Sequence, residues 1–409
     1  MDPALVARLT SGEGAGLLAS LPPYDESQAL SLGLRLRTAG FDDELVAAAL
    51  TQSRLRARGG AKFGADANRL LFTADGLEQA TRPQIAATHA DRFVAAGLRT
   101  VHDLGCGIGS DAMAFAAAGL TVCAVDADPG TAAIAAANLR PWPSASVSTQ
   151  TAESVRLPRG GSAHGVGAWL DPARRTTGIA DITGRTRRTF GLDELAPSWE
   201  FVQEVGHQLP GAGAKLSPAF PHAKVPMGAE AQWTSYRGEV LECAIWFGAL
   251  ATHAGRSAQV ITPRGTYRLT DAACEGRIPT AARLEDLRGH LYEADRAVVR
   301  AGLTEVLVRA VDGLELAMGS GYVTSPHEFA LPWARRYAVT EAMPFNVKAI
   351  RAWLRDHDVG RVTLKKRGVT TDEVAFRRQL RLSGSREATV LLTRVNTAQV
   401  ALILTPSPH

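Results

Sequence analysis

The first 95 residues carry alanine and leucine at helical spacing. In LSLGLRLRTAG and in FDDELVAAALTQSRLRARGG the apolar residues recur three and four positions apart, which predicts amphipathic helices. Further on, we expect a long amphipathic helix that opens at Thr81 and has Pro83 in its first turn. Residues 1–95 are therefore predicted to form a helical region.

From about residue 96 the pattern changes to short apolar runs separated by helical segments rich in small residues. This alternation predicts a parallel α/β sheet with right-handed crossover connections. We expect its strands at residues 98–104, 120–126, 145–152, 165–172 and 211–218, and its helices at 111–119, 128–140 and 198–209. Two further segments have the pattern of hairpin-forming strands at the far edge of the sheet, residues 230–250 and 256–269.

The last third of the chain begins with a charge-mixed stretch. Helical spacing follows over residues 292–311, which predicts one helix. From residue 335 the pattern runs strand, helix, strand, helix, strand, strand, which predicts a small α+β domain. The predicted organisation is a helical region over 1–95, an α/β domain over 96–270, a connecting segment with a helix over 271–328, and the small domain over 329–409.

The composition is that of a soluble globular protein, with 45% hydrophobic and 21% charged residues over 409 positions. Four cysteines stand far apart without a C-x-x-C pair or a histidine cluster, which argues against a zinc site or a disulfide framework. The chain has no apolar run of membrane-spanning length, and its first residues lack the order of a signal peptide. We therefore expect a cytoplasmic protein with no metal and no membrane partner.

The net charge of +4 is unevenly distributed along the chain. Residues 335–394 hold 14 Lys and Arg against 6 Asp and Glu, a local net charge of +8, which leaves −4 for the rest. A basic C-terminal domain on a mildly acidic body favours a polyanionic partner. The alternative is that arginines simply fill solvated helix faces.

A glycine turn follows the first predicted strand of the α/β domain. Asp103 ends that strand in VHDLGCGIGS, and Gly105, Gly107 and Gly109 follow at every second position. Glycines let the backbone turn sharply and let a ligand lie directly on it. The next strand ends at Asp126, where a carboxylate can accept hydrogen bonds from both hydroxyls of a ribose.

Asp103 distinguishes between the ligands that such a turn could hold. A carboxylate here repels a pyrophosphate and attracts a cationic sulfonium with an α-amino group, and the D-x-G-x-G-x-G spacing is tighter than the dinucleotide pattern. We therefore predict S-adenosyl-L-methionine as the cofactor, with Asp103 near its methionine amino end, Asp126 at its ribose and Glu153 near its adenine. The alternative is a turn that binds no ligand.

The segment HDLGCGIGSDAMAFAAAG followed by VCAVDADP resembles the first two motifs of class I, Rossmann-like S-adenosylmethionine methyltransferases. FTADGLEQAT upstream, with KLSP and LKKRG downstream, resembles a bacterial group of these enzymes that carry a C-terminal THUMP-like domain. The resemblance covers most of the chain from about Phe63 onward. It implies a Rossmann-like sheet and a C-terminal domain that handles RNA, since the better-understood relatives are RNA methyltransferases, including the trimethylguanosine synthase type.

Asp171 and Pro172 end the fourth predicted strand, GVGAWLDP. Amino-group methyltransferases that this chain resembles carry Asn, Asp or Ser here, followed by Pro-Pro and an aromatic residue. We expect Asp171 and the Pro172 carbonyl to act as the catalytic groups, by orienting an exocyclic amine toward the methyl group. Ala173 and Arg174 depart from that pattern, although a guanidinium plane can stack on a base or hold a phosphate. The alternative is that Asp171 merely caps the strand.

Basic residues in two parts of the chain are candidates for binding substrate. One cluster follows the fourth strand and should overhang the ligand-binding edge of the sheet. The other lies where a C-terminal strand ends, a common position for clamping phosphates. The members are Arg174, Arg175, Arg185, Arg187 and Arg188 in the first cluster and Lys365, Lys366 and Arg367 in the second. The alternative for both clusters is a solvated surface.

Together these features predict an S-adenosylmethionine-dependent methyltransferase that modifies a base nitrogen of tRNA or rRNA. The reaction needs no metal and no nucleophilic side chain, because the cofactor supplies the electrophile. Two alternatives stay open. One is a methyltransferase that acts on a small molecule or a protein, and the other is an RNA-binding protein that keeps the fold without the activity.

Overall fold

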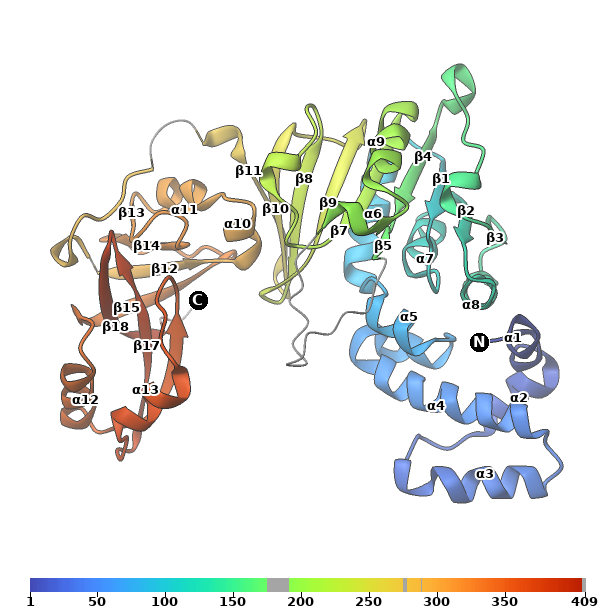
Figure 1. The fold of residues 1–409 in the computed structure, drawn as a ribbon, viewed down its shortest axis with the longest axis horizontal. Coiled ribbons are helices and arrows are strands. Elements are labelled where there is room, and N and C mark those ends of the chain that lie inside the picture. The colour runs from blue at the N-terminus through green and yellow to red at the C-terminus, as the bar shows by residue number, and fades with distance from the viewer. Residues whose placement is uncertain (175–190, 275–277, 288, 407–409) are drawn as a thin grey trace. The chain divides into compact units, whose positions relative to one another are not determined.

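The computed structural model describes residues 1–174, 191–274, 278–287 and 289–406. The chain forms two compact units (Figure 1). The first consists of Met1–Leu216 with Ala244–Thr252, and the second of Ser217–Cys243 with His253–His409. Within the described residues, no helix is both long and apolar enough to cross a membrane.

Helices form the N-terminal part of the first unit, as the apolar spacing predicts. They are α1 (Pro3–Leu9), α2 (Gly12–Ser20), α3 (Ala29–Thr38), α4 (Asp43–Phe63), α5 (Ala74–Gln79) and α6 (Pro83–Ala95). The prediction that Thr81 opens the last of these helices is wrong, because α6 begins at Pro83 with Arg82 as its N-cap. The Thr81 hydroxyl instead donates a hydrogen bond to the buried carboxylate of Asp111.

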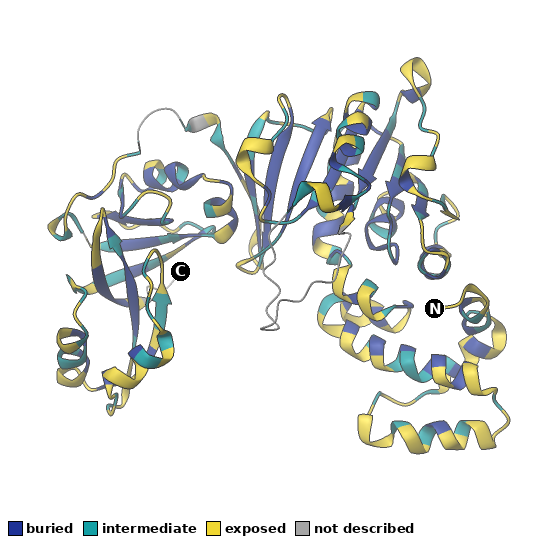
Figure 2. Cartoon of the chain, in the orientation of Figure 1, coloured by how far each residue is buried: buried dark blue, intermediate teal, exposed yellow. Residues whose placement is uncertain are grey.

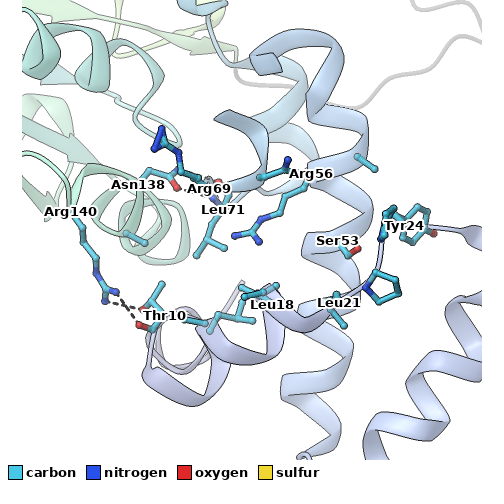
Figure 3. A pocket seen from close by; sticks show the side chains of 18 residues that line it. Thr10, Leu18, Leu21, Tyr24, Ser53, Arg56, Arg69, Leu71, Asn138 and Arg140 are labelled. Carbon is cyan, nitrogen blue, oxygen red and sulfur yellow. Dashed lines mark hydrogen bonds between the residues drawn. The ribbon is translucent and has the colours of Figure 1, made fainter. Parts of the chain in front are cut away.

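The N-terminal helices are attached to α8 (Pro129–Leu139) by polar contacts at the end of that helix. Arg140 donates hydrogen bonds to the carbonyl and the hydroxyl of Thr10 (Figure 3). Asn138 donates to the carbonyls of Leu71 and Ile108. A cavity of about 720 Å³ remains between these helices. Asn138 thereby links the helical region to the glycine turn, in which Ile108 lies.

A parallel sheet forms the centre of the first unit. Its strands are β1 (Thr100–Leu104), β2 (Thr121–Asp126), β3 (Ala145–Thr149), β4 (Val166–Leu170) and β7 (Gly211–Leu216), in the order β7-β4-β1-β2-β3. Helix α7 (Ser110–Ala117) connects β1 to β2, α8 connects β2 to β3, and α9 (Trp199–Gln208) precedes β7. These elements confirm the predicted alternation and the Rossmann-like fold class.

The core of the first unit is aromatic and lies directly under the strand ends. Trp169 on β4 and Trp246 on β9 (Glu239–Gly248) have ring centroids 5.2 Å apart, and His89 from α6 lies 4.3 Å from Trp169. Gly213 on β7 makes room for these rings, because a Cβ there would lie 2.6 Å from an atom of Trp246. The central strands β4 and β7 are mostly buried, whereas the edge strand β3 has no buried residue (Figure 2).

The second unit contains two groups of strands. In the first, β8 (Glu230–Tyr236) pairs in parallel with β10 (Gly255–Thr262), and β10 forms the expected hairpin with β11 (Gly265–Thr270). The other is a sheet in the order β13-β14-β12-β15-β18-β17-β16. Its strands are β12 (His290–Ala294), β13 (Leu314–Glu315), β14 (Tyr322–Ser325), β15 (Ala334–Pro344), β16 (Val359–Lys366), β17 (Arg386–Val395) and β18 (Ala398–Pro406). With α12 (Val347–Asp356) and α13 (Glu373–Leu380), the strands from β15 onward confirm the α+β pattern predicted for the C-terminal part.

The prediction of one helix over residues 292–311 is wrong. This segment forms the end of β12 and two short helices, α10 (Arg296–Arg300) and α11 (Thr304–Ala310). Gly302 separates the helices with a φ of +71°, and Leu291 and Tyr292 are fully buried where β12 pairs with β15. Because of that pairing, the C-terminal sheet begins before the predicted boundary at residue 329.

Candidate functional site

The strands of the first unit end at a common level. The register pairs the last residues of β1 with those of β2 and β4, and it pairs the end of β4 with β7. The residues that follow the last matched pairs are Gly105, Asp126, Asp171 and Lys215. These four positions therefore lie side by side at the carboxyl edge of the sheet, where parallel sheets bind their ligands.

Gly105, Gly107 and Gly109 form the turn between β1 and α7, with positive φ values of +90°, +56° and +87°. A side chain would strain the backbone at each position. At Gly105 an added Cβ would lie 3.2 Å from the carbonyl oxygen of Asp171, whereas at Gly107 it would meet nothing within 4 Å. The turn thus packs against the end of β4 at Gly105 and borders open space at Gly107.

The carboxylate of Asp103 is buried and unpaired. The residue is 1% exposed, and neither of its carboxylate oxygens has a hydrogen-bond partner among the described residues. Burial, followed by the nearby carboxylates of Asp111 and Asp171, raises the pKa of Asp103 well above its usual value. A cationic group at this position would relieve that cost. The site therefore fits the ammonium group of the predicted cofactor.

The carboxylate of Asp126, at the end of β2, accepts hydrogen bonds from two backbone N–H groups. Gly107 donates to one oxygen and Asp128 to the other, each at 3.0 Å. Burial raises the pKa of Asp126 even though both bonds lower it. Each oxygen keeps acceptor capacity for a further donor such as a ribose hydroxyl. Glu153 lies exposed on the short turn Ala152–Ser154 after β3. The roles of Asp126 at the ribose and of Glu153 at the adenine stay predictions.

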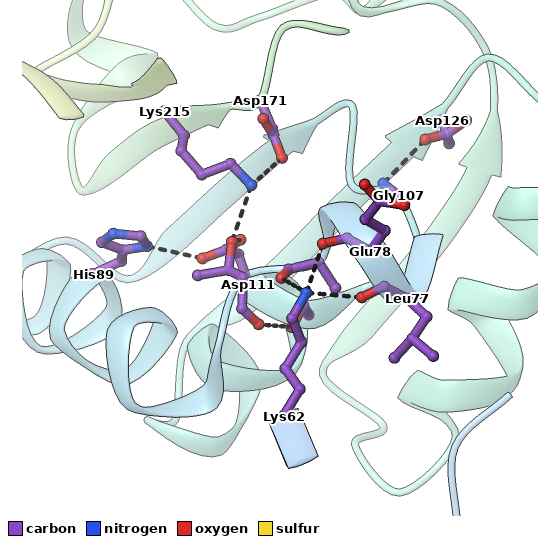
Figure 4. A network of polar contacts seen from close by, with 12 residues as sticks. Lys62, Leu77, Glu78, His89, Gly107, Asp111, Asp126, Asp171 and Lys215 are labelled. Atoms are coloured by element: carbon purple, nitrogen blue, oxygen red, sulfur yellow. Dashed lines mark hydrogen bonds and ion pairs between the residues drawn. The ribbon is translucent and has the colours of Figure 1, made fainter. Parts of the chain in front are cut away.

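Asp171 forms an ion pair with Lys215 across the ends of β4 and β7, with 2.5 Å between Oδ2 and Nζ (Figure 4). The side chain of Asp171 is 34% exposed and that of Lys215 is 15% exposed. Lys215 also donates a hydrogen bond to the hydroxyl of Thr81 at 3.1 Å. No role was predicted for Lys215. The signal that identifies it is the register, because it stands next to Asp171 on the neighbouring strand.

Asp111, in the first turn of α7, continues this polar chain inward. It is 6% exposed and accepts a hydrogen bond from Thr81 at 2.6 Å, while His89 Nδ1 lies 2.8 Å from its other oxygen. Burial alone would raise the pKa of Asp111, but the contacts with His89 and the charge of Lys215 lower it overall. The chain from Asp171 to His89 is therefore continuous (Figure 4). Sequence reasoning missed Thr81, Asp111 and His89 as site residues, because α6 brings them together only in the folded chain.

Lys62, near the end of α4, holds α5 in place beside the glycine turn. Its ammonium donates hydrogen bonds of 2.6 to 2.8 Å to three carbonyls at the end of α5, those of Leu77, Glu78 and Ala80 (Figure 4). Burial lowers the pKa of Lys62 to about 8. α5 packs closely on the turn, because a Cβ at Gly76 would lie 2.4 Å from the side chain of Ile108.

The thiol of Cys106 lies within the same turn. The residue is 8% exposed, and burial raises the pKa of its thiol well above the usual value. The thiol therefore stays protonated at neutral pH, as suits a small loop residue better than a nucleophile. Across the described residues, no group of three or more His, Cys, Asp or Glu side chains is arranged to hold a metal ion.

The residues after Asp171 are described only in part. Pro172 is buried and Ala173 is exposed. Arg174 belongs to the two-residue strand β5 (Ala173–Arg174), which pairs with β6 (Leu195–Ala196). The other arginines of this predicted cluster lie outside the described residues, namely Arg175, Arg185, Arg187 and Arg188.

The second predicted basic cluster lies at the end of β16. Lys365 pairs with Glu293 at 2.5 Å, and the exposed Lys366 donates to the carbonyl of Thr371 at 2.8 Å. Arg367 is exposed and donates to the carbonyl of Gly319 at 3.4 Å. The structure therefore gives each of the three a partner within the protein. Their role in substrate binding stays a prediction.

Comparison with known proteins adds relatives for both halves of the chain. The THUMP domain-like family profile matches residues 334–406, and the profile of a domain of unknown function (DUF8688) matches residues 2–59. An uncharacterized S-adenosylmethionine-dependent methyltransferase, present in two strains of Mycobacterium tuberculosis, is 28% identical over 359 residues, which cover 85% of this chain and 92% of the relative. A crystal structure from Porphyromonas gingivalis W83, of a protein assigned as a methyltransferase, superposes with a TM-score of 0.71 at 17% identity, covering 95% of this chain and 100% of the other.

These similarities fix the class of the protein. The chain is a homologue of S-adenosylmethionine-dependent methyltransferases, has the fold of a methyltransferase and carries a THUMP-like C-terminal domain. The predicted methyltransferase class and fold are thereby confirmed. The cofactor in the name of the Mycobacterium tuberculosis relative is the one that Asp103 and the glycine turn predict.

Proposed function

We propose that this methyltransferase homologue transfers a methyl group from S-adenosylmethionine to a base nitrogen of RNA, in tRNA or rRNA. The observation that carries the proposal is the unpaired carboxylate of Asp103, 1% exposed beside a glycine turn and an acidic strand end. A buried carboxylate without a partner is strongly unfavourable, so the group stays protonated unless a cation joins it. The cationic cofactor provides that partner.

The residues at the strand ends would have separate roles in the proposed reaction. When bound, S-adenosylmethionine would supply an electrophilic methyl group, and S-adenosylhomocysteine would be left when the bond between that methyl group and sulfur breaks. Asp103 would hold its ammonium group and Asp126 would accept hydrogen bonds from its ribose. Asp171 and the carbonyl of Pro172 would accept the two hydrogens of an exocyclic amine, so that the nitrogen lone pair is aimed at the methyl group. The proton released from nitrogen would pass to Asp171, whose carboxylate Lys215 orients.

The C-terminal part of the chain supports RNA as the substrate. Residues 335–394 carry a local net charge of +8, and the match to the THUMP domain-like family covers nearly the same segment, 334–406. A concentrated positive charge attracts the phosphate backbone irrespective of sequence. Recognition of RNA by this segment would bring a base to the strand ends for modification.

Nucleoside mass spectrometry of RNA from a strain that lacks this gene, beside its parent, tests the proposal. We expect one methylated nucleoside to disappear from tRNA or rRNA. The wild-type gene should restore it, and the gene with Asp171→Ala should not. If the RNA is unchanged while a methylated protein or metabolite disappears, the substrate assignment is wrong. If the purified chain binds the cofactor but methylates no acceptor, the catalytic assignment is wrong.

A further inference from the structure

A cleft of about 520 Å³ within the second unit gathers basic side chains from distant parts of the sequence. It is lined by the turn after β8, the turn between β10 and β11, the segment from β12 into α10, and the start of β15. We call this site the basic cleft. Its cationic lining residues are Arg237, Arg264, Arg296, Arg335 and Lys365, and Trp333 lies among them.

Three of these guanidinium groups are available to a ligand. Arg237, Arg264 and Arg296 are exposed and form no ion pair within the part of the chain that the structure describes. Arg237 stands at a turn with a positive φ of +51°, and its guanidinium lies 5.4 Å from the ring centroid of Tyr236. Arg335 is also exposed, and the nearby hydroxyl of Tyr337 raises the pKa of its guanidinium.

The two carboxylates that line the basic cleft are already committed to partners inside the protein. Glu293 is paired with Lys365 and accepts hydrogen bonds from the hydroxyls of Tyr322 and Tyr337, at 3.0 and 2.9 Å. Asp295 caps α10 by accepting a hydrogen bond from the N–H of Ala297 at 2.8 Å. The local charge presented to a ligand is therefore positive.

Trp333 supplies the second kind of contact. Its side chain is half-buried at the wall of the basic cleft, beside Arg335 in the sequence. An aromatic face next to several guanidinium groups is the combination that binds single-stranded nucleic acid, because bases stack on the ring while phosphates meet the cations. An acidic peptide would use the cations but would leave the indole face without a planar partner.

We propose that the basic cleft binds a single-stranded segment of the RNA substrate, with phosphates on Arg237, Arg264 and Arg296 and a base on Trp333. This inference rests on the proposed RNA methyltransferase function. It adds a binding surface to that function, because these four residues all lie outside the segment 334–406 that matches the THUMP domain-like family.

Binding of a fluorescent single-stranded RNA to the full chain, measured by anisotropy across a salt series, tests the inference. The test variant combines Arg237→Gln, Arg264→Gln and Arg296→Gln. The control combines Lys224→Gln, Arg283→Gln and Arg300→Gln, which removes equal charge from exposed positions of the same unit outside both the basic cleft and residues 335–394. Loss of three phosphate contacts should weaken binding at least about tenfold at low salt and reduce the salt slope by about two, since each contact to a single strand contributes about 0.7.

Trp333→Ala separates stacking from charge. We expect it to weaken RNA binding about tenfold with the salt slope unchanged, and Trp333→Phe to restore most of the affinity. The same variants are assayed for methyl transfer to RNA, and the unfolding temperature of each is compared with that of the wild type.

The outcomes separate the two proposals. If the wild type methylates RNA and the test variant binds RNA as tightly as the control variant, the basic cleft is not the binding site although the proposed function stands. If the test variant alone loses RNA affinity but the wild type methylates no RNA, the cleft stands and the proposed function is wrong. Binding of an acidic protein in place of RNA by the wild type contradicts both.

Discussion

Asp103 places a carboxyl group where no described residue pairs with it. Lys215 is near enough to lower the pKa of Asp103, but its ammonium is paired directly with Asp171. The raised pKa of Asp103 means that folding favours its protonated form. The contribution of Asp103 to the stability of the ligand-free fold is therefore fully present only below pH 3.8, its unfolded pKa. That contribution is lost as the pH rises through the raised folded pKa.

Asp103→Asn removes this titration. Without cofactor, we expect the variant to unfold at a higher temperature than the wild type at neutral pH, with the difference shrinking as the pH is lowered toward 3.8. With S-adenosylmethionine the order should reverse, because the amide offers no charge to the ammonium group, and affinity should fall at least about tenfold. Thermal unfolding across pH and calorimetric titration measure the two effects. Equal melting at every pH would show that Asp103 is not a buried charge.

Lys215→Met tests whether the ion pair positions Asp171. The variant leaves that carboxylate without its cationic partner and the hydroxyl of Thr81 without its donor. We expect kcat to fall about tenfold or more while KM for the cofactor changes little, because the contact acts on the acceptor side. Lys215→Arg keeps the charge and should recover part of kcat. A loss of cofactor affinity with an unchanged kcat would contradict a positioning role.

The residues of the site that could be predicted are those fixed by local sequence. Asp103, the three glycines, Asp126 and Asp171 are recognisable because each stands where an apolar run ends. Lys215 also ends such a run, but its importance depends on which strands are neighbours and in what register, and local spacing does not contain that information. His89 and Asp111 depend on the docking of α6, which only the packed core determines.

At the level of elements, the glycine turn packs against a short helix whose C-terminal carbonyls are bonded to one lysine. α5 has six residues, too few to be stable alone, and its last carbonyls have no partners within the helix. Lys62 satisfies three carbonyls at that end, so α4 supports α5 and α5 supports the turn.

Lys62→Met should therefore loosen α5 as a unit. We expect a loss of roughly 1–3 kcal/mol in the free energy of unfolding, since three carbonyls lose their donor and two of these hydrogen bonds are part-buried. We also expect weaker cofactor binding, since Ile108 loses its support. Arg58→Met on the exposed face of the same helix is the matched control and should change neither quantity measurably. Denaturant unfolding and calorimetric titration provide the comparison, and equal effects of the two variants would rule out this support.

The same distinction between local and distant information explains which elements were predicted. Strands β1 to β4 and helices α7 and α8 follow from periodicity, because alternating apolar runs and helical spacing are properties of neighbouring residues. Residues 292–311 have helical spacing too, yet Tyr292 lies in a strand because β14 and β15 pair with it on both sides. Gly302 is the local signal that one continuous helix was not to be expected.

At the scale of the whole molecule, the C-terminal sheet does not coincide with the segment that resembles a known family. The THUMP domain-like match begins at residue 334, at the first residue of β15. β15 lies between β12 and β18, so one of its two neighbours belongs to residues that precede the match. Tyr337, 1% exposed, is buried in that arrangement.

A fragment of residues 329–409 should consequently fold poorly, whereas one of residues 278–409 should fold. The shorter fragment loses β12, leaves one edge of β15 unpaired and uncovers Tyr337. Circular dichroism and cooperative thermal unfolding measure the difference. If the shorter fragment unfolds as cooperatively as the longer one, the sheet is not one structural unit.

The close approach of Gly105 to the carbonyl of Asp171 predicts that the two substrates bind in a fixed order. A Cβ at Gly105 would lie 3.2 Å from this carbonyl, so the glycine turn and the backbone at the end of β4 are in close contact. A ligand that orders the glycine turn would also order Asp171. Bound S-adenosylmethionine would therefore position Asp171 before the RNA substrate binds. We expect an ordered mechanism in which S-adenosylmethionine binds first and S-adenosylhomocysteine leaves last. In steady-state inhibition experiments, S-adenosylhomocysteine should then compete with S-adenosylmethionine and not with RNA.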